Sequence, residues 1–369
     1  MKAESYSDAH VQAVKDFNRR MTEGGAPQGI AESPIPKWLP AQAGMPLYQE
    51  YFVVLDDRGV HGGYILKHQP FWLNGESAQV ADYRFPLSEG IVNSRYGLVG
   101  LLTVKDAMRR QPLSFGLGMG SRSEAVARLL KIVKWKMVDC PFFFYVNRPF
   151  RFLRGIAHLR RRTERRLALD LLAFSGLGWL GLKCVQGFRA FRPSGTSGTT
   201  IEEVDVFGSW SDDVWDRAKK AYRFIAVRDR AMLDRLYPAS DERFSRILVQ
   251  RAGEAIGWAV MLDTTMKEHK QFGNLRIGSI VDCLAVPGTE RAVVAAATLF
   301  LRRRKVDMIV SNQLHRDWCD AFGSCGYLAG PSNFLFAAAP ELERQLDPFE
   351  EVSRLVHMTR GDGDGPINL

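Results

Sequence analysis

Hydrophobic positions near the start of the chain predict a helix followed by a hairpin. Val11, Val14, Phe17 and Met21 recur at helical spacing, which predicts an amphipathic helix. A stretch rich in proline and glycine comes next. Residues 50–67 (EYFVVLDDRGVHGGYILK) then form two apolar runs around an Asp-Asp-Arg-Gly turn, and this pattern is typical of a β-hairpin.

The hairpin pattern occurs a second time in the chain. Residues 53–66 (VVLDDRGVHGGYIL) align without a gap on residues 247–260 (ILVQRAGEAIGWAV), so that Gly63 corresponds to Gly257. The spacing between the two copies is 194 residues. A match of this length in both hydrophobic pattern and glycine position indicates an internal repeat.

Both copies continue in the same way after the hairpin. The same spacing relates residues 112–119 (PLSFGLGM) to residues 306–313 (VDMIVSNQ). A short helical stretch follows in each copy, and then a final apolar strand at residues 141–146 or 332–337. The order strand, strand, strand, helix, strand, helix, strand predicts an α/β fold with a mixed sheet and helices packed on its faces.

The repeats also set the domain boundaries that we expect. The first unit spans residues 1–150 and the second spans residues 201–346, with a basic and apolar helical connector and a linker at 151–200. Residues 347–369 form a tail that we expect to be partly disordered. The length of 369 residues agrees with two domains, because one hydrophobic core rarely serves so long a chain.

Charge changes the picture only in the connector. The formal net charge is +9, but residues 148–192 carry eleven Lys and Arg against two Asp and Glu, while the sections on either side nearly balance. A nucleic-acid-binding protein usually spreads basic charge over a domain face, so we do not expect a nucleic-acid partner. The connector fits either a helix lying on an anionic membrane surface or a solvated basic helix between the domains.

Cysteine and histidine usage bears on compartment and metal binding. The five cysteines form no CxxC pair and the first residues are polar, so we expect a cytoplasmic protein with reduced thiols, peripheral to a membrane at most. The uncharged stretch 171–182 is shorter than the roughly 20 residues of a membrane-spanning helix. The histidines show no metal-ligand spacing, and we predict no metal site.

Residues 281–310 (VDCLAVPGTERAVVAAATLFLRRRKVDMIV) place a strand, an Arg-bearing turn, an apolar helix and another strand in succession. This segment resembles the acyl-CoA binding core of the GNAT superfamily of N-acyltransferases. The resemblance implies two tandem GNAT-like units, acyl-CoA (acetyl-CoA above all) as co-substrate, and transfer of the acyl group to an amine. In that family, the backbone N–H groups of the turn hold the CoA pyrophosphate at a helix N-terminus.

The two copies keep the family's phosphate-binding turn only in part. The resemblance places cofactor contacts at Arg95, Tyr96, Gly97, Val99 and Gly100 in the first copy and at Arg291 in the second. Leu98 and Val294 replace the middle glycine of the pattern. The first copy is the better candidate because two glycines remain to open the backbone, although each segment also fits an ordinary loop that enters a core helix.

The acceptor amine must lose a proton before or during transfer, which calls for a base. Glu89 and Asp282 lie where members of the family often carry that carboxylate, and capping or ion pairing is the alternative role for both. Asp282 interrupts an apolar strand, where an unpaired carboxylate is costly. Ser88, Ser311 and Asn312 are candidates for orienting substrate, or for capping the helices that follow.

One family feature is missing from both copies. The tyrosine that often protonates the leaving thiolate is replaced by Leu130 in the first copy and by Phe322 in the second. We therefore expect an N-acyltransferase with degenerate motifs, acting on an amine of a small molecule or an envelope precursor. Two alternatives stay open: a Fem-type transferase that uses aminoacyl-tRNA, and a non-catalytic GNAT-like scaffold at the membrane surface.

Overall fold

The computed structural model describes residues 1–26, 28–32, 39–160, 163–174, 181, 184, 198–332 and 334–363. The chain divides into two compact units. The first unit consists of Met1–Asp139 and Asn333–Ser353, and the second of Cys140–Ser332 and Arg354–Leu369. Each unit is therefore built from two separate stretches of sequence.

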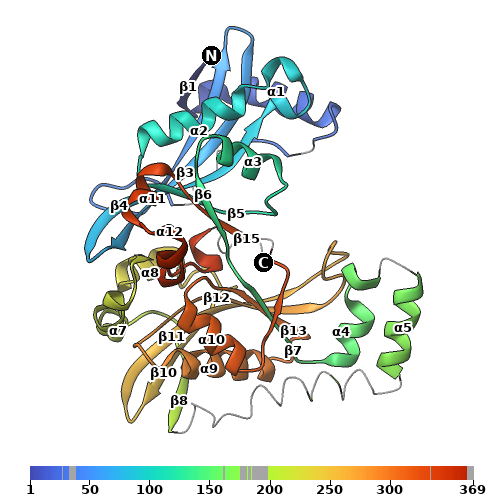
Figure 1. The fold of residues 1–369 in the computed structure, drawn as a ribbon, viewed down its shortest axis with the longest axis vertical. Helices are drawn as coiled ribbons and strands as arrows, with labels where there is room; N and C mark the ends of the chain where they lie inside the picture. The colour runs from blue at the N-terminus through green and yellow to red at the C-terminus, as the bar shows by residue number, and fades with distance from the viewer. Residues whose placement is uncertain are drawn as a thin grey trace. The chain divides into compact units, whose positions relative to one another are not determined.

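The strands of the first unit form one mixed sheet (Figure 1). Their order is β1 (Lys2–Ser5), β2 (Tyr48–Asp56), β3 (Gly59–Leu73), β4 (Glu76–Ser88), β5 (Ser114–Met119), β15 (Phe334–Ala338) and β6 (Lys136–Asp139). Only β4 and β5 are parallel; every other neighbouring pair is antiparallel. The helices of this unit are α1 (Val11–Glu23), α2 (Val99–Arg110), α3 (Ala125–Ile132), α11 (Pro340–Gln345) and α12 (Phe349–Val352).

Helices pack on both faces of this sheet. The predicted amphipathic helix is confirmed as α1, which buries Val14, Phe17 and Met21 in one cluster with the β3 residue Val60. A second cluster contains Val104 of α2, Leu130 of α3 and sheet residues such as Tyr64 and Tyr83. The sheet is thus the middle layer of the first unit.

The second unit repeats the strand order of the first. Its sheet runs β8 (Thr199–Glu203), β10 (Ser245–Arg251), β11 (Glu254–Thr265), β12 (Arg276–Ala285), β13 (Met308–Asn312), β7 (Phe142–Val146) and β14 (Leu328–Gly330). Here β12 and β13 are the parallel pair. The other elements are α4 (Pro149–Gly155), α5 (Thr163–Phe174), α7 (Trp210–Ala218), β9 (Phe224–Ala226), α8 (Arg230–Leu236), α9 (Glu290–Arg303) and α10 (Arg316–Ser324).

The predicted repeat is visible in these elements. The two hairpins form as expected, β2 with β3 and β10 with β11. Strands β5 and β13 begin at Ser114 and Met308, which are 194 residues apart as the alignment requires. The predicted mixed α/β fold is therefore confirmed.

The last strand of each repeat does not lie where the sequence suggested. Strand β7, expected to close the first sheet, pairs with β13 and β14 in the second unit, and β15 pairs with β5 and β6 in the first. The contact boundaries fall after residues 139, 332 and 353. Both strands are short apolar runs, so their hydrophobic pattern fits either sheet equally well.

Gly257 shows why the recurring glycines matter. A Cβ at Gly257 would lie 2.5 Å from Leu284 O on β12 and 2.5 Å from Val293 Cγ2 on α9. At the corresponding Gly63, a Cβ would lie 2.7 Å from Phe52 O. The absence of a side chain lets β12 and α9 approach β11 closely at Gly257, and lets β2 approach β3 closely at Gly63.

We expect Gly257→Ala to lower the free energy of unfolding by about 1–3 kcal/mol, because the new methyl group overlaps backbone and a buried valine. Gly323→Ala in α10 is the matched control: a Cβ there meets no atom within 4 Å, and alanine favours a helix, so stability should rise by about 0.4–1 kcal/mol. Chemical denaturation of the full chain measures both. Equal effects of the two variants would contradict the close packing at Gly257.

Candidate functional site

The parallel strands of the first unit pair over a short distance only. Strands β4 and β5 share the register pairs Ala81–Ser114 and Asp82–Phe115, after which β4 continues to Ser88 without β5 as its neighbour. A bulge also interrupts the pairing of β4 with β3 near its end, between Arg84 and Leu87. The end of β4 therefore separates from β5 and leads into the loop before α2.

The predicted phosphate-binding turn lies in this loop. Arg95 is exposed, and Gly97 ends the short 3-10 helix Ser94–Tyr96 in helical conformation just before α2 begins at Val99. Side chains of Tyr96 and Val99 point into the unit and are buried, so a ligand would meet only their backbone. The first N–H groups of a helix lack intrahelical partners and attract anions.

Two loops approach each other closely beside α2. A Cβ on Gly90 would lie 2.7 Å from Tyr96 O and 2.9 Å from the Cα of Gly97, and one on Gly100 would lie 3.8 Å from the Ser88 Cβ. Ser88 itself accepts a hydrogen bond from Gly90 N, as its alternative capping role predicts. The structure thus brings the predicted residues of the first copy together around the end of β4.

Glu89 is the most strongly bound of these residues. Arg20 donates from Nε and Nη2 to its two carboxylate oxygens, both at 2.8 Å, and His61 Nδ1 lies 2.7 Å from Oε2. His61 Nε2 lies 3.0 Å from Asp56 Oδ1, and the His61 ring stacks on Tyr96 at 3.9 Å between ring centres. Glu89 therefore ties α1 and the β3 strand to the loop that precedes α2.

The charge state of Glu89 follows from these contacts. Burial raises the pKa of Glu89, but the hydrogen bonds from Arg20 and His61 together outweigh burial and hold the pKa below its usual value. The carboxylate is therefore charged at neutral pH. Sequence spacing gave no indication of this cluster, since Arg20 lies 69 residues and His61 lies 28 residues away.

In the second unit, the side chain of Asp282 is buried within a cluster of hydrogen-bonded side chains. Arg228 Nε donates to both Asp282 oxygens at 3.1 Å, and Tyr237 and Thr359 donate to the same carboxylate at 3.0 and 3.2 Å. Arg228 Nη2 also donates to both oxygens of Asp362 at 2.8 Å. Burial raises the pKa of Asp282 above its usual value, although the Arg228 guanidinium opposes this shift.

Segment 354–363 lies against the separated ends of β12 and β13. The parallel pair ends at Ser279–Val310, and beyond it Gln313 forms a bridge with Thr359. Gly361 packs so tightly that a Cβ there would lie 2.1 Å from the Tyr237 hydroxyl oxygen. In the second unit, the chain itself thus occupies the place where the parallel strands diverge.

The helix that follows β12 differs from α2 in charge. α9 begins with Glu290, which is buried and accepts a hydrogen bond from Gly288 N at 3.2 Å. Burial raises the pKa of Glu290. Arg291 is half-buried, and its carbonyl oxygen accepts from Cys325 Sγ. A carboxylate thus stands at the turn where the resemblance places a pyrophosphate.

Ser311 and Asn312 make structural hydrogen bonds in the second unit. Ser311 Oγ donates to Ile280 O across the β12–β13 pair at 3.0 Å. Asn312 Oδ1 accepts from Arg360 Nη1 at 2.9 Å, which helps to hold segment 354–363. Neither residue lies in the unit that contains Ser88 and Glu89.

The two positions that replace the family's tyrosine lie in the cores of their units. Leu130 is buried among sheet and helix residues of the first unit, and the Phe322 ring stacks on Phe143 at 5.2 Å in the second. Neither side chain carries a proton to donate. The described residues hold no cluster of His, Cys, Asp or Glu with metal-binding geometry.

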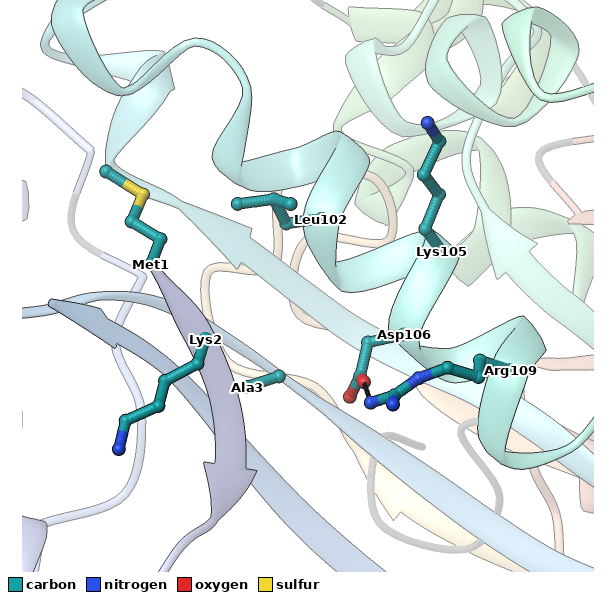
Figure 2. Close-up of a pocket in the computed structure, with 7 residues that line it drawn as sticks. All are labelled: Met1, Lys2, Ala3, Leu102, Lys105, Asp106 and Arg109. Atoms are coloured by element: carbon teal, nitrogen blue, oxygen red, sulfur yellow. Dashed lines mark hydrogen bonds and ion pairs between the residues drawn. The ribbon is translucent and has the colours of Figure 1, made fainter.

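A hollow of about 300 Å³ lies elsewhere in the first unit, between β1 and the outward face of α2 (Figure 2). Figure 2 shows Arg109 turned toward Asp106, while Lys2 and Lys105 point away. Asp106 also accepts hydrogen bonds from Tyr64 and Arg110, so its oxygens are already bound. The hollow runs along α2 rather than at its N-terminus, and we do not include it in the candidate site.

Solved structures with the GNAT fold resemble this chain. An Enterococcus faecalis protein described as a probable N-acyltransferase has a TM-score of 0.52 and 10% identity, covering 94% of this chain and 74% of its own. A GCN5-related N-acetyltransferase from Anabaena variabilis gives 0.52 and 9%, covering 92% and 72%. Saccharomyces cerevisiae N-myristoyltransferase, solved with bound myristoyl-CoA and inhibitors, gives 0.51 and 10%, covering 92% and 79%.

No protein-family model and no curated protein sequence matches the chain. At this level of identity, the structural likeness establishes the fold alone.

We expect Glu89→Gln to lower the free energy of unfolding at pH 7 by about 1–3 kcal/mol, because Arg20 and His61 lose a charged partner. A carboxyl group whose pKa is lower in the folded than in the unfolded protein stabilises the fold fully at pH values above its unfolded-state pKa. This contribution is lost as the pH falls through the pKa of the folded state. The gap between wild type and variant should therefore narrow only below about pH 4. Denaturation midpoints across pH measure it.

Glu76→Gln is the control for this prediction, since Glu76 is exposed at the start of β4. Its stability should match that of the wild type at every pH. A Glu89→Gln gap that persists unchanged into strong acid would show that the carboxylate charge does not stabilise the fold.

Proposed function

We propose that the chain is an acyl-CoA-dependent N-acyltransferase whose first unit holds acyl-CoA. The proposal rests on a difference between the two units at the turn that precedes α2 in the first unit and α9 in the second. At the first unit's turn, Arg95 is exposed, whereas Glu290 stands at the second unit's turn and segment 354–363 lies against its strand ends. A polyanionic ligand is favoured by the first arrangement and repelled by the second.

The residues of the first unit fit such a ligand. Arg95 supplies a positive charge, and Gly97 leaves backbone accessible in front of α2. The separation of β4 from β5 leaves backbone groups of β4 outside the parallel ladder. Acyl-CoA supplies the activated thioester, and backbone N–H groups are the donors that stabilise an oxyanion at its carbonyl carbon.

Glu89 is our proposed proton acceptor for the amine. It lies in the same unit, directly after β4, and it is charged at neutral pH. His61 links it to Asp56, whose side chain is about one quarter exposed, and this chain of hydrogen bonds leads from a buried carboxylate toward solvent. Asp282 is the other predicted base, and because Arg228 and Tyr237 donate hydrogen bonds to its carboxylate, we propose a structural role for it.

The acceptor that we propose is the amine of a small molecule or an envelope precursor, and the acyl group is acetyl. The non-catalytic alternative gains support from two features: both predicted bases are hydrogen-bonded within the fold, and Leu130 and Phe322 cannot donate a proton. CoA binding and acyl transfer, measured separately, discriminate between the two functions.

We expect calorimetry with CoA and acetyl-CoA to detect binding to the full chain. Arg95→Ala should weaken it about 10- to 100-fold, the effect of one charge-assisted contact. Arg291→Ala is the matched substitution in the second unit and should leave the affinity within twofold. The reverse pattern would move the site to the second unit, and no binding by the wild-type chain would contradict the proposed function.

We expect Glu89→Gln to lower kcat for acetyl transfer to a small amine by about 10²-fold or more, as removal of a general base does. Folded protein, checked by circular dichroism, should be compared over a range of pH, with CoA release followed by chromatography. The wild-type rate should show an acid limb as pH falls through the Glu89 pKa, which lies below the usual carboxyl value, and the variant should lack this limb. A variant with full activity, or one that retains the acid limb, would exclude Glu89 as the base.

A further inference from the structure

The helices α4 and α5 form a hairpin whose inner side is firmly packed. Phe152 and Leu153 of α4 and Ala173 of α5 belong to one buried cluster with Phe272 and Leu275 of the second unit. Where α4 ends, the Gly155 backbone lies so near Leu275 that a Cβ would come within 2.5 Å of its Cδ2. The orientation of the hairpin is therefore set by the core.

Arg160 fixes the two helices to each other. Its Nη1 and Nη2 atoms donate to the two oxygens of Asp170 on α5, both at 2.8 Å, and Nη1 also donates to Leu153 O at 2.9 Å. Arg160 thus neutralises the charge of Asp170, and the exposed side chains on the outer side of α5 include leucines. This bidentate contact makes the outward face of α5 a defined surface.

Leucines occupy that outward face. Leu167 and Leu171 are 67% and 71% exposed and lie four residues apart, so that they are neighbours on one side of α5. Leu172 beside them and Leu159 in the turn before α5 are also exposed. Single exposed leucines are ordinary on protein surfaces. A group of exposed leucines on one helix hairpin indicates a surface that binds another protein or a membrane.

Positive charge accompanies these leucines. Arg151 and Arg154 of α4 are exposed, and Arg154 lies over the ring of the exposed Phe150. Residues 148–166 contain eight arginines and only one acidic residue, Glu164. A partner that complements this surface therefore has negatively charged groups next to an apolar region into which the leucines can insert.

We propose that the outward surface of the α4–α5 hairpin, formed by Phe150, Arg151, Arg154, Leu159, Leu167 and Leu171, docks on an anionic lipid bilayer. Exposed leucines enter the boundary between head groups and acyl chains, and the arginines pair with anionic lipids. An acidic protein surface would satisfy the arginines but would leave the leucines in water. Among the described helices, none is long and apolar enough to cross a membrane.

The test is cosedimentation of the full chain with vesicles of phosphatidylcholine alone or with one quarter phosphatidylglycerol. We expect binding to the anionic vesicles only, and weaker binding as salt rises. Leu167→Gln with Leu171→Gln, and Arg151→Gln with Arg154→Gln, should each lower the partition coefficient about 10- to 30-fold, at roughly 1 kcal/mol per basic residue. All four side chains are exposed, and Arg148 still lies 3.8 Å from the buried Asp307 when its other ion-pair partner Arg151 is replaced, so folding should be retained.

Control variants remove comparable exposed side chains elsewhere in the chain. Ile132→Gln removes an equally exposed apolar side chain from α3, and Arg58→Gln with Arg128→Gln removes two exposed arginines from the first unit. These variants should bind like the wild type. No vesicle binding by the wild-type chain, equal binding to neutral vesicles, or equal losses in the control variants would overturn the proposal.

Discussion

Parallel strands that separate before they end leave backbone N–H and C=O groups without ladder partners, and these groups must be satisfied in another way. In the second unit, β12 and β13 separate after Ser279 and Val310, and segment 354–363 lies against their ends. Arg228 holds this segment by binding Asp282 of β12 and Asp362 together. Loss of any one of these buried charges would leave another uncompensated, so the arrangement resists change.

The same strand order carries opposite charges in the two units. Gly63 pairs with Leu87, and its counterpart Gly257 pairs with Ala285. Arg84 lies three residues before Leu87 on β4, and Asp282 lies three residues before Ala285 on β12. Glu89 is therefore not the counterpart of Asp282, although both seemed equivalent in the sequence. The two units therefore share the same strand order, while the side chains on their diverging strands differ.

Local patterns predicted much of the fold. The hairpins follow from apolar alternation around turns, where Gly59 and Gly253 adopt positive φ, and α1 follows from the spacing of Val14, Phe17 and Met21. Such local patterns could not predict contacts between residues that are far apart in the sequence. Arg228 and Asp362 are 134 residues apart, and the final strands lie in each other's expected sheets, which no hydrophobic period encodes.

The arginines of the connector illustrate why composition alone misleads. Arg160 donates to Asp170 on α5 and is half-buried. Arg151 and Arg154 are exposed next to exposed apolar side chains, although Arg151 Nε also lies 3.7 Å from the buried Asp307. Identical residues a few positions apart therefore serve packing in one case and an external surface in the other. Since this surface belongs to the second unit and the proposed acyl-CoA turn to the first, the net charge of +9 carries no information about the substrate. Binding of CoA and binding of lipid are separate properties of the chain, and the failure of one leaves the other intact.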